Sequence, residues 1–144
     1  LSLGLCSPEW LDRVHPALLA AERSAVLEGS DLLHADLRSD NLCFDGDRTL
    51  LVDWNWACRG NRIADIAFWL PSLHAEGGPA PEEILREPEL AALTAGFFAA
   101  HAGLPPGSLP PAVRGIQKFQ LGSAFPWAVR ALGLVDPGKL YCPP

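Results

Sequence analysis

Methionine is absent from this chain of 144 residues, and only two lysines and one tyrosine occur. The chain begins at Leu1 without an initiator methionine, so we expect it to be a fragment or a processed piece of a longer protein. The two lysines, Lys118 and Lys139, both lie in the last third of the sequence. Any function that needs a lysine earlier in the chain is therefore excluded for this piece by itself.

Long apolar runs and a basic surface are also missing. No run of 18 or more apolar residues occurs, which argues against a transmembrane helix. The first residues do not place a basic segment before an apolar one, so we see no secretory signal. The formal net charge of -6 argues against a nucleic-acid footprint. We therefore expect neither a nucleic acid nor a membrane as partner.

Paired cysteines are the next absence. The four cysteines lie far apart and form no C-x-x-C pair: Cys6, Cys43, Cys58 and Cys142. This spacing fits neither a zinc site nor a dense disulfide framework. It is typical of a reducing compartment, and we expect a cytoplasmic protein.

What is present predicts one domain, mainly α with a small β-hairpin (α+β), because 49% of the residues are hydrophobic and helical patterns dominate. Helices are predicted over 7–29 (in two parts, divided at Pro16), 62–70 (ended or kinked by Pro71), 81–87, 89–102 and 111–133. Strand-like pieces are predicted at 32–33, 42–44 and 49–53. The last two flank the turn Asp45-Gly46-Asp47-Arg48, so residues 42–53 are predicted to form the hairpin.

Aspartates concentrate in one part of the chain, since seven of the nine fall between residues 31 and 65. We expect several of them to cap turns. Asp36 and Asp53 differ, because each follows or ends an apolar strand, where a carboxylate is costly unless it is paired or bound to a metal. The hairpin is expected to bring these two together, and their hard oxygen ligands favour Mg²⁺ over zinc.

Two motifs carry a family resemblance. The segment from His34 to Asn41 reads HADLRSDN, which has the form H-x-D-x-x-x-x-N, and Asp53 follows twelve residues after Asn41 in LVDWNWA. Together with Asp65-Ile66-Ala67, they resemble the aminoglycoside phosphotransferase and choline kinase family, the small-molecule relatives of the protein kinases. The resemblance covers essentially the whole chain. It implies that residues 1–144 form the C-terminal lobe of a protein-kinase-like fold.

The resemblance also implies roles for the residues that transfer a phosphoryl group. Asp36 would accept or orient the proton of the acceptor hydroxyl, and Asn41 and Asp53 would hold Mg²⁺ against the phosphates of ATP. Arg38 lies two residues after Asp36, where protein kinases carry a lysine, and it would stabilise the transferred phosphoryl group. The alternative for Arg38 is an exposed charge without a catalytic role.

Other residues are expected to support the site. By the resemblance, His34 supports the catalytic loop and Asp65 hydrogen-bonds backbone amides of that loop. Trp54 replaces the phenylalanine of the protein-kinase Asp-Phe-Gly. Trp56 and Trp69 are expected to lie in the core.

The family's N-terminal lobe has no counterpart in this sequence. That lobe supplies a strand lysine and a phosphate-covering loop, and neither a lysine nor a G-x-G-x-x-G motif precedes His34. We therefore expect the ATP-clasping lobe to be absent from this chain and the chain alone to be inactive or nearly so. Joined to that lobe, it is expected to phosphorylate a hydroxyl of a small molecule with ATP.

Two other functions stay open. One is a catalytically silent lobe that binds a small molecule or a partner chain. The other is a Mg²⁺-dependent phosphate hydrolase, although Asp53-Trp54-Asn55 lacks the second aspartate of a D-x-D-x-T pattern. The acceptor stays open too. The glutamates of the later helices would suit a cationic amine, or they would simply favour helix N-termini: Glu76, Glu82, Glu83, Glu87 and Glu89.

Overall fold

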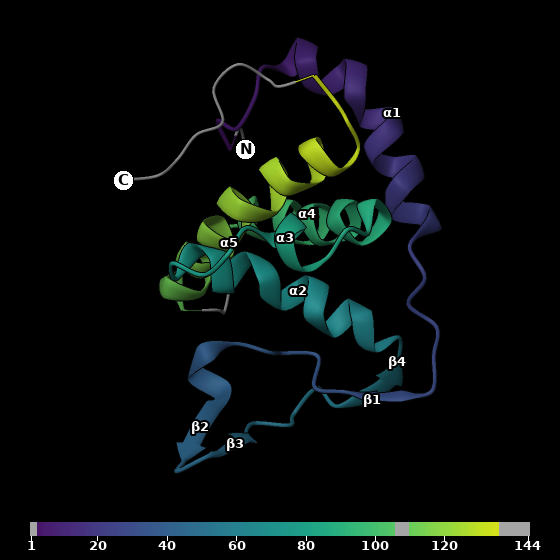
Figure 1. Cartoon of the computed structure of the whole chain (residues 1–144). Coiled ribbons are helices and arrows are strands. Elements are labelled where there is room, and N and C mark those ends of the chain that lie inside the picture. Colours follow the sequence, from purple (N-terminus) through teal and green to yellow (C-terminus); the bar gives the residue numbers. More distant parts are fainter. Residues whose placement is uncertain (1–2, 106–109, 136–144) are drawn as a thin grey trace.

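Five α-helices and two small antiparallel sheets make up the computed structural model, which describes residues 3–105 and 110–135 (Figure 1). The helices are α1 (Pro8–Ser24), α2 (Arg62–Ala75), α3 (Pro81–Ile84), α4 (Pro88–Ala102) and α5 (Pro111–Ala131). The strands are β1 (Asp31–Leu33), β2 (Leu42–Asp45), β3 (Arg48–Leu51) and β4 (Cys58–Gly60), with a 3-10 turn, η1 (Ser39–Asn41), before β2. The predicted fold class, mainly α with a small β component, is confirmed.

Local sequence sets where the helices begin. The Ser7 hydroxyl accepts a hydrogen bond from the backbone N–H of Trp10 at 3.2 Å and caps α1. The Asn61 side chain caps α2 in the same way through the N–H of Ile63, at 3.0 Å. Helices α1, α3, α4 and α5 have proline within their first two positions, where no N–H is needed within the helix.

Two internal prolines contradict the predicted helix boundaries. The prediction of two helical parts over 7–29 is wrong, because α1 runs without a break from Pro8 to Ser24 and contains Pro16. The predicted end or kink at Pro71 is also wrong as a boundary, because α2 continues to Ala75. Pro71 is fully buried, and the burial of its ring offsets the backbone hydrogen bond that proline cannot donate. Tertiary packing therefore overrides the local signal to stop.

Several predicted boundaries differ from the observed ones by a few residues, and one strand was missed. The helix predicted over 81–87 ends at Ile84, the one predicted from 89 begins at Pro88, and the last helix ends at Ala131 instead of 133. The predicted strand 49–53 ends at Leu51, so Asp53 follows the strand without belonging to it. Strand β4 was not predicted, because three residues that include a glycine carry no strand pattern of their own.

The core lies between α2, α4 and α5, and α1 covers α4 (Figure 1). Alanines from α4 and α5 are prominent in the core, and their small side chains allow helices to approach closely: Ala91, Ala95, Ala124 and Ala128. Large side chains fill the space around them, including fully buried Leu70, Leu121 and Trp127. Within the part of the chain that the structure describes, no helix is both long and apolar enough to cross a membrane.

The β1–β4 sheet attaches the segment after α1 to the start of α2. Asp31 pairs with Gly60, and Leu33 with Cys58. The preceding extended segment continues this pairing, because the Leu27 carbonyl accepts from the N–H of Asn61 at 3.0 Å. The sheet thus positions the residues on either side of it, the loop after β1 and the first turn of α2.

Replacing Gly29 by alanine is expected to destabilise the chain by about 1–3 kcal/mol through overpacking. A Cβ at Gly29 would overlap the carbonyl oxygen of Gly60 and lie 2.7 Å from the backbone nitrogen of Asn61, so backbone must move. Gly115, within α5, is the matched control, because a Cβ there meets nothing within 4 Å. Gly115→Ala should stabilise the chain by up to about 1 kcal/mol. Urea unfolding measures both changes, and equal effects would contradict the close approach.

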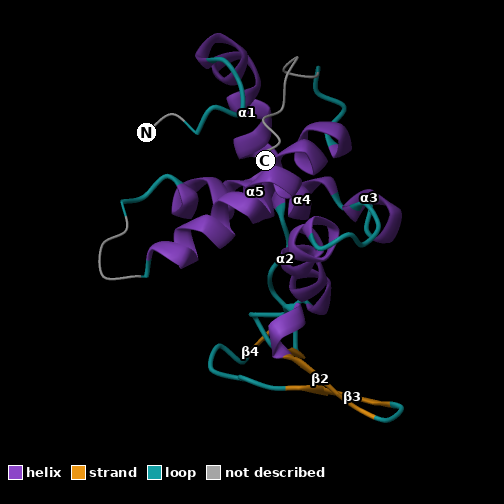
Figure 2. Ribbon diagram, turned by 90° about the vertical axis from the view of Figure 1, so that its left-hand side faces the viewer, coloured by secondary structure: helices purple, strands orange, loops and turns teal. Residues whose placement is uncertain are grey.

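The β2–β3 hairpin stands apart from the helices (Figure 2). Leu42 pairs with Leu51 and Asp45 with Arg48, and Gly46 forms the turn with a φ of 58°. Phe44 on this hairpin is 75% exposed. No other described element covers this apolar side chain. An isolated two-stranded hairpin is only marginally stable in water, so a covering layer would stabilise this one.

Candidate active site

The loop after β1 is anchored by the first turn of α2. One carboxylate oxygen of Asp65 accepts from the backbone N–H of His34 at 2.6 Å, and the other accepts from that of Ala35 at 2.8 Å. Ala35 has a φ of 60°, a backbone conformation that side chains other than glycine rarely adopt. Asp65 therefore holds the loop in a turn that the loop would not favour by itself.

His34 connects this loop to the segment that leads into Asp53. Its ring is buried, and Nε2 donates to the backbone carbonyl of Val52 at 2.8 Å. The ring lies 4.7 Å from that of Trp54, centre to centre, at an angle of 55°. Trp54 in turn donates from Nε1 to the carbonyl of Leu51 at 2.9 Å. Through these contacts, His34 and Trp54 hold the loop after β1 against the segment that leads into Asp53.

Asn41 lies between Asp36 and the strand that precedes Asp53. Its side-chain nitrogen Nδ2 donates to the backbone carbonyl of Asp36 at 2.9 Å and lies 3.4 Å from the carboxylate oxygen Oδ2. Its backbone carbonyl accepts from the N–H of Val52 at 3.0 Å. Asn41 is buried, whereas Asp36 is half-buried. The hydrogen bonds of Asn41 thus connect the loop of Asp36 to the segment that leads into Asp53.

Backbone strain gathers at the same place. Asp53 has a φ of 63°. Among the described residues, Ala35 and Asp53 are the two residues other than glycine with a positive φ. The Asp53 side chain is exposed and contacts the side-chain amide of Asn55. Such conformations cost energy and persist where surrounding contacts impose them, which is common at functional sites.

Arg38 is held beside three carboxylates. Its Nε donates to Asp40 at 2.9 Å, and its Nη2 contacts the other oxygen of the same carboxylate. The hydrogen bond from Arg38 lowers the pKa of Asp40, although partial burial opposes this. The pKa of Arg38 is raised, first by the hydrogen bond to Asp40 and also by the charges of Asp36 and Asp53. Sequence reasoning missed Asp40, although a carboxylate two residues after an arginine is a visible signal.

The glutamates of the later helices are engaged within the protein. The Ser39 hydroxyl donates to Glu76 at 2.9 Å and so connects η1 to the end of α2. Glu83 accepts from the backbone N–H of Ala80 at 2.9 Å and caps α3. Glu82 pairs with Arg130, whose Nε lies 2.6 Å from Oε1. These contacts favour a structural role for the three glutamates over an acidic lining for a cationic acceptor.

Trp56 is not in the core. It is 70% exposed, so that prediction is wrong. Its segment follows Asp53 and precedes β4, and the sequence could not show that this tryptophan would lie at the surface. Trp69 is half-buried on α2.

The predicted metal ligands, Asn41 and Asp53, are too few to hold a metal ion without further ligands. No group of three or more His, Cys, Asp or Glu side chains suited to a metal occurs in residues 3–105 and 110–135. The predicted ligands Asn41 and Asp53 supply oxygen atoms alone. Mg²⁺ fits such a set, because it is commonly bound by one or two carboxylates together with the phosphates of a nucleotide.

Comparison with known proteins adds one finding. A family model described as the phosphotransferase enzyme family matches residues 6–107. The match spans the loop after β1, the β2–β3 hairpin and helix α2, and thus every residue placed above in the candidate site. No curated protein and no solved structure matches the chain.

Proposed function

Since this chain belongs to the phosphotransferase enzyme family, we propose that it serves the transfer of the γ-phosphoryl group of ATP to a hydroxyl group of a small molecule. One observation carries the proposal. Asn41 bonds the backbone of Asp36 and, through its own backbone, the residue before Asp53. The proposed base and the two proposed metal ligands are thereby connected through one buried residue, and in-line phosphoryl transfer needs such groups close together.

Each residue then has a chemical role. Asp36 accepts or orients the proton of the attacking hydroxyl. Asn41 and Asp53 hold Mg²⁺, which when bound neutralises the negative charge of the phosphates. Arg38, oriented by Asp40, places a positive charge beside the transferred phosphoryl group. His34 and Asp65 fix the loop that carries Asp36.

We further propose that residues 1–144 form a C-terminal lobe that acts together with an N-terminal lobe, which supplies the lysine for the α- and β-phosphates. Both lysines of the chain follow the candidate site in sequence, which supports this. So do three large apolar side chains in the segments around the site, because Leu32, Phe44 and Trp56 are 67%, 75% and 70% exposed.

The cytoplasm is the proposed location. Among the described residues, Cys6, Cys43 and Cys58 form no disulfide, which supports this location. Cys142 lies outside the described residues.

A transfer assay with ATP labelled on the γ-phosphoryl group tests the proposed function. The chain joined to an N-terminal lobe of the same family should label a hydroxyl compound at a rate of about 1–100 per second, whereas the chain alone should transfer little or nothing. Ordinary rates from the chain alone would refute the need for a second lobe. Release of label only as inorganic phosphate would favour the hydrolase, and binding of ATP without transfer would favour a silent lobe.

A further inference from the structure

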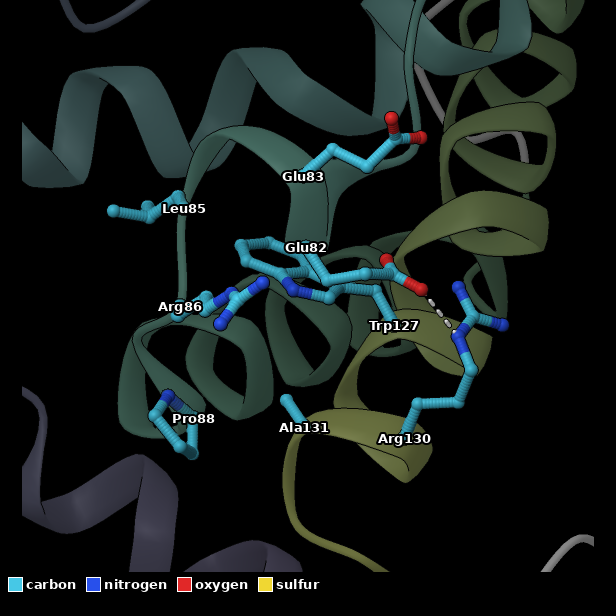
Figure 3. A pocket seen from close by; sticks show the side chains of 8 residues that line it. All are labelled: Glu82, Glu83, Leu85, Arg86, Pro88, Trp127, Arg130 and Ala131. Atoms are coloured by element: carbon cyan, nitrogen blue, oxygen red, sulfur yellow. Dashed lines mark hydrogen bonds and ion pairs between the residues drawn. The ribbon is translucent and has the colours of Figure 1, made fainter.

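A cavity of about 390 Å³ lies away from the candidate active site. Its lining residues come from α3, from the connection between α3 and α4, from the first residue of α4 and from the C-terminal half of α5 (Figure 3). None of them belongs to residues 31–65, which hold the candidate site. The volume is within the range of small-molecule pockets, about 300–1,000 Å³.

Charged side chains of both signs surround the cavity: Glu82, Glu83, Arg86 and Arg130. Glu82 and Arg130 neutralise each other through their ion pair, and the hydrogen bond from Arg130 lowers the pKa of Glu82. Arg86 has no ion-pair partner among the described residues. Figure 3 shows Arg86 and Arg130 on opposite sides of Glu82. One of the two guanidinium groups at the cavity thus has no ion-pair partner among the described residues.

Two buried polar atoms at the cavity lack a partner. Trp127 is fully buried, and its Nε1 has no hydrogen-bond acceptor among the described residues. Oε2 of Glu82 is also buried, and no described residue donates a hydrogen bond to it. A buried polar group without a partner is costly, so a donor and an acceptor left open at one cavity indicate a polar occupant.

The remaining lining is apolar. Leu85, Pro88 and Ala131 contribute aliphatic surface beside the charged groups. An occupant that matches the whole cavity therefore combines an anionic group, a hydrogen-bond donor of positive charge and an aliphatic part.

We propose that this cavity binds a small zwitterion, an α-amino acid with an aliphatic side chain. Its carboxylate would accept from the guanidinium of Arg86 and the indole N–H of Trp127. Its ammonium group would donate to Oε2 of Glu82, and its side chain would contact Leu85 and Pro88.

Titration of the chain with L-leucine, followed by NMR of the tryptophan indole N–H groups, tests this proposal. The Trp127 signal should shift saturably with a Kd of about 1 mM, as for a ligand of this size. Two matched probes each lack one charge: 4-methylpentanoate has no ammonium group, and 3-methylbutylamine has no carboxylate. The affinity of each probe should be lower than that of L-leucine by about tenfold or more, since hydrogen bonds to charged groups are lost.

A variant pair makes the same test on the protein. Arg86→Gln should weaken L-leucine binding by about tenfold or more while the melting temperature stays unchanged, because Arg86 is exposed. Arg23→Gln, at an exposed position on α1, should change neither. The absence of a saturable Trp127 shift, equal affinity in Arg86→Gln, or equal binding of 4-methylpentanoate would each overturn the proposal. The outcome does not depend on catalysis, so it is separate from the test of the proposed function.

Discussion

Replacing Asp36 by alanine is expected to lower phosphoryl transfer by about 10²–10⁴-fold, the usual contribution of a general base, in the chain joined to an N-terminal lobe. The carboxylate is half-buried, and its neighbour Asn41 bonds mainly to the backbone carbonyl of Asp36. The substitution therefore removes the base and keeps the shorter hydrogen bond from Asn41 to the backbone of residue 36. Nucleotide binding should stay within a few-fold of the unaltered protein, because Asn41 and Asp53 are untouched.

Two measurements check this prediction. Steady-state transfer gives kcat, and titration with Mg²⁺-ATP gives the nucleotide affinity. Asp47→Asn is the matched control, because Asp47 is an exposed aspartate in the hairpin turn. It should leave both values unchanged. Normal turnover by Asp36→Ala would remove Asp36 from the role of base, and a parallel loss of nucleotide affinity would point to a metal-binding role instead.

Replacing Asp65 by alanine is expected to destabilise the chain by about 2–4 kcal/mol, since two hydrogen bonds to a charged group are lost and two backbone N–H groups are left without their acceptor. The loss should also affect activity, because Ala35 is then free to leave its positive φ and the loop that carries Asp36 follows it. Function and stability should therefore fall together.

Asp65→Asn separates the hydrogen bonds from the packing. Asparagine has the same size but keeps a single side-chain acceptor, so it should lie between the unaltered chain and Asp65→Ala in urea unfolding. Asp31→Asn, at an exposed position on β1, is the control and should unfold like the unaltered chain. If Asp65→Asn matched the unaltered chain in both stability and activity, the contact from Asp65 to the loop would not support the site.

Sequence alone predicted the fold class and the hairpin, and it proposed the residues of the candidate site except Asp40. These features are local or carried by fixed spacing, as with the turn through Gly46 and the motif from His34 to Asn41. Caps and turns act over a few residues, and local chemistry therefore predicts them well. The roles of the site residues stay predictions until the variants are measured.

The tertiary structure decided the contacts between distant parts of the chain. Glu82 and Arg130 lie 48 positions apart, and β4 gains its strand geometry only through pairing with β1. Pro71 stays within α2 because packing around it offsets its local cost. The reason is the same in each case: the free energy comes from burial and pairing across the fold, which no short stretch of sequence contains.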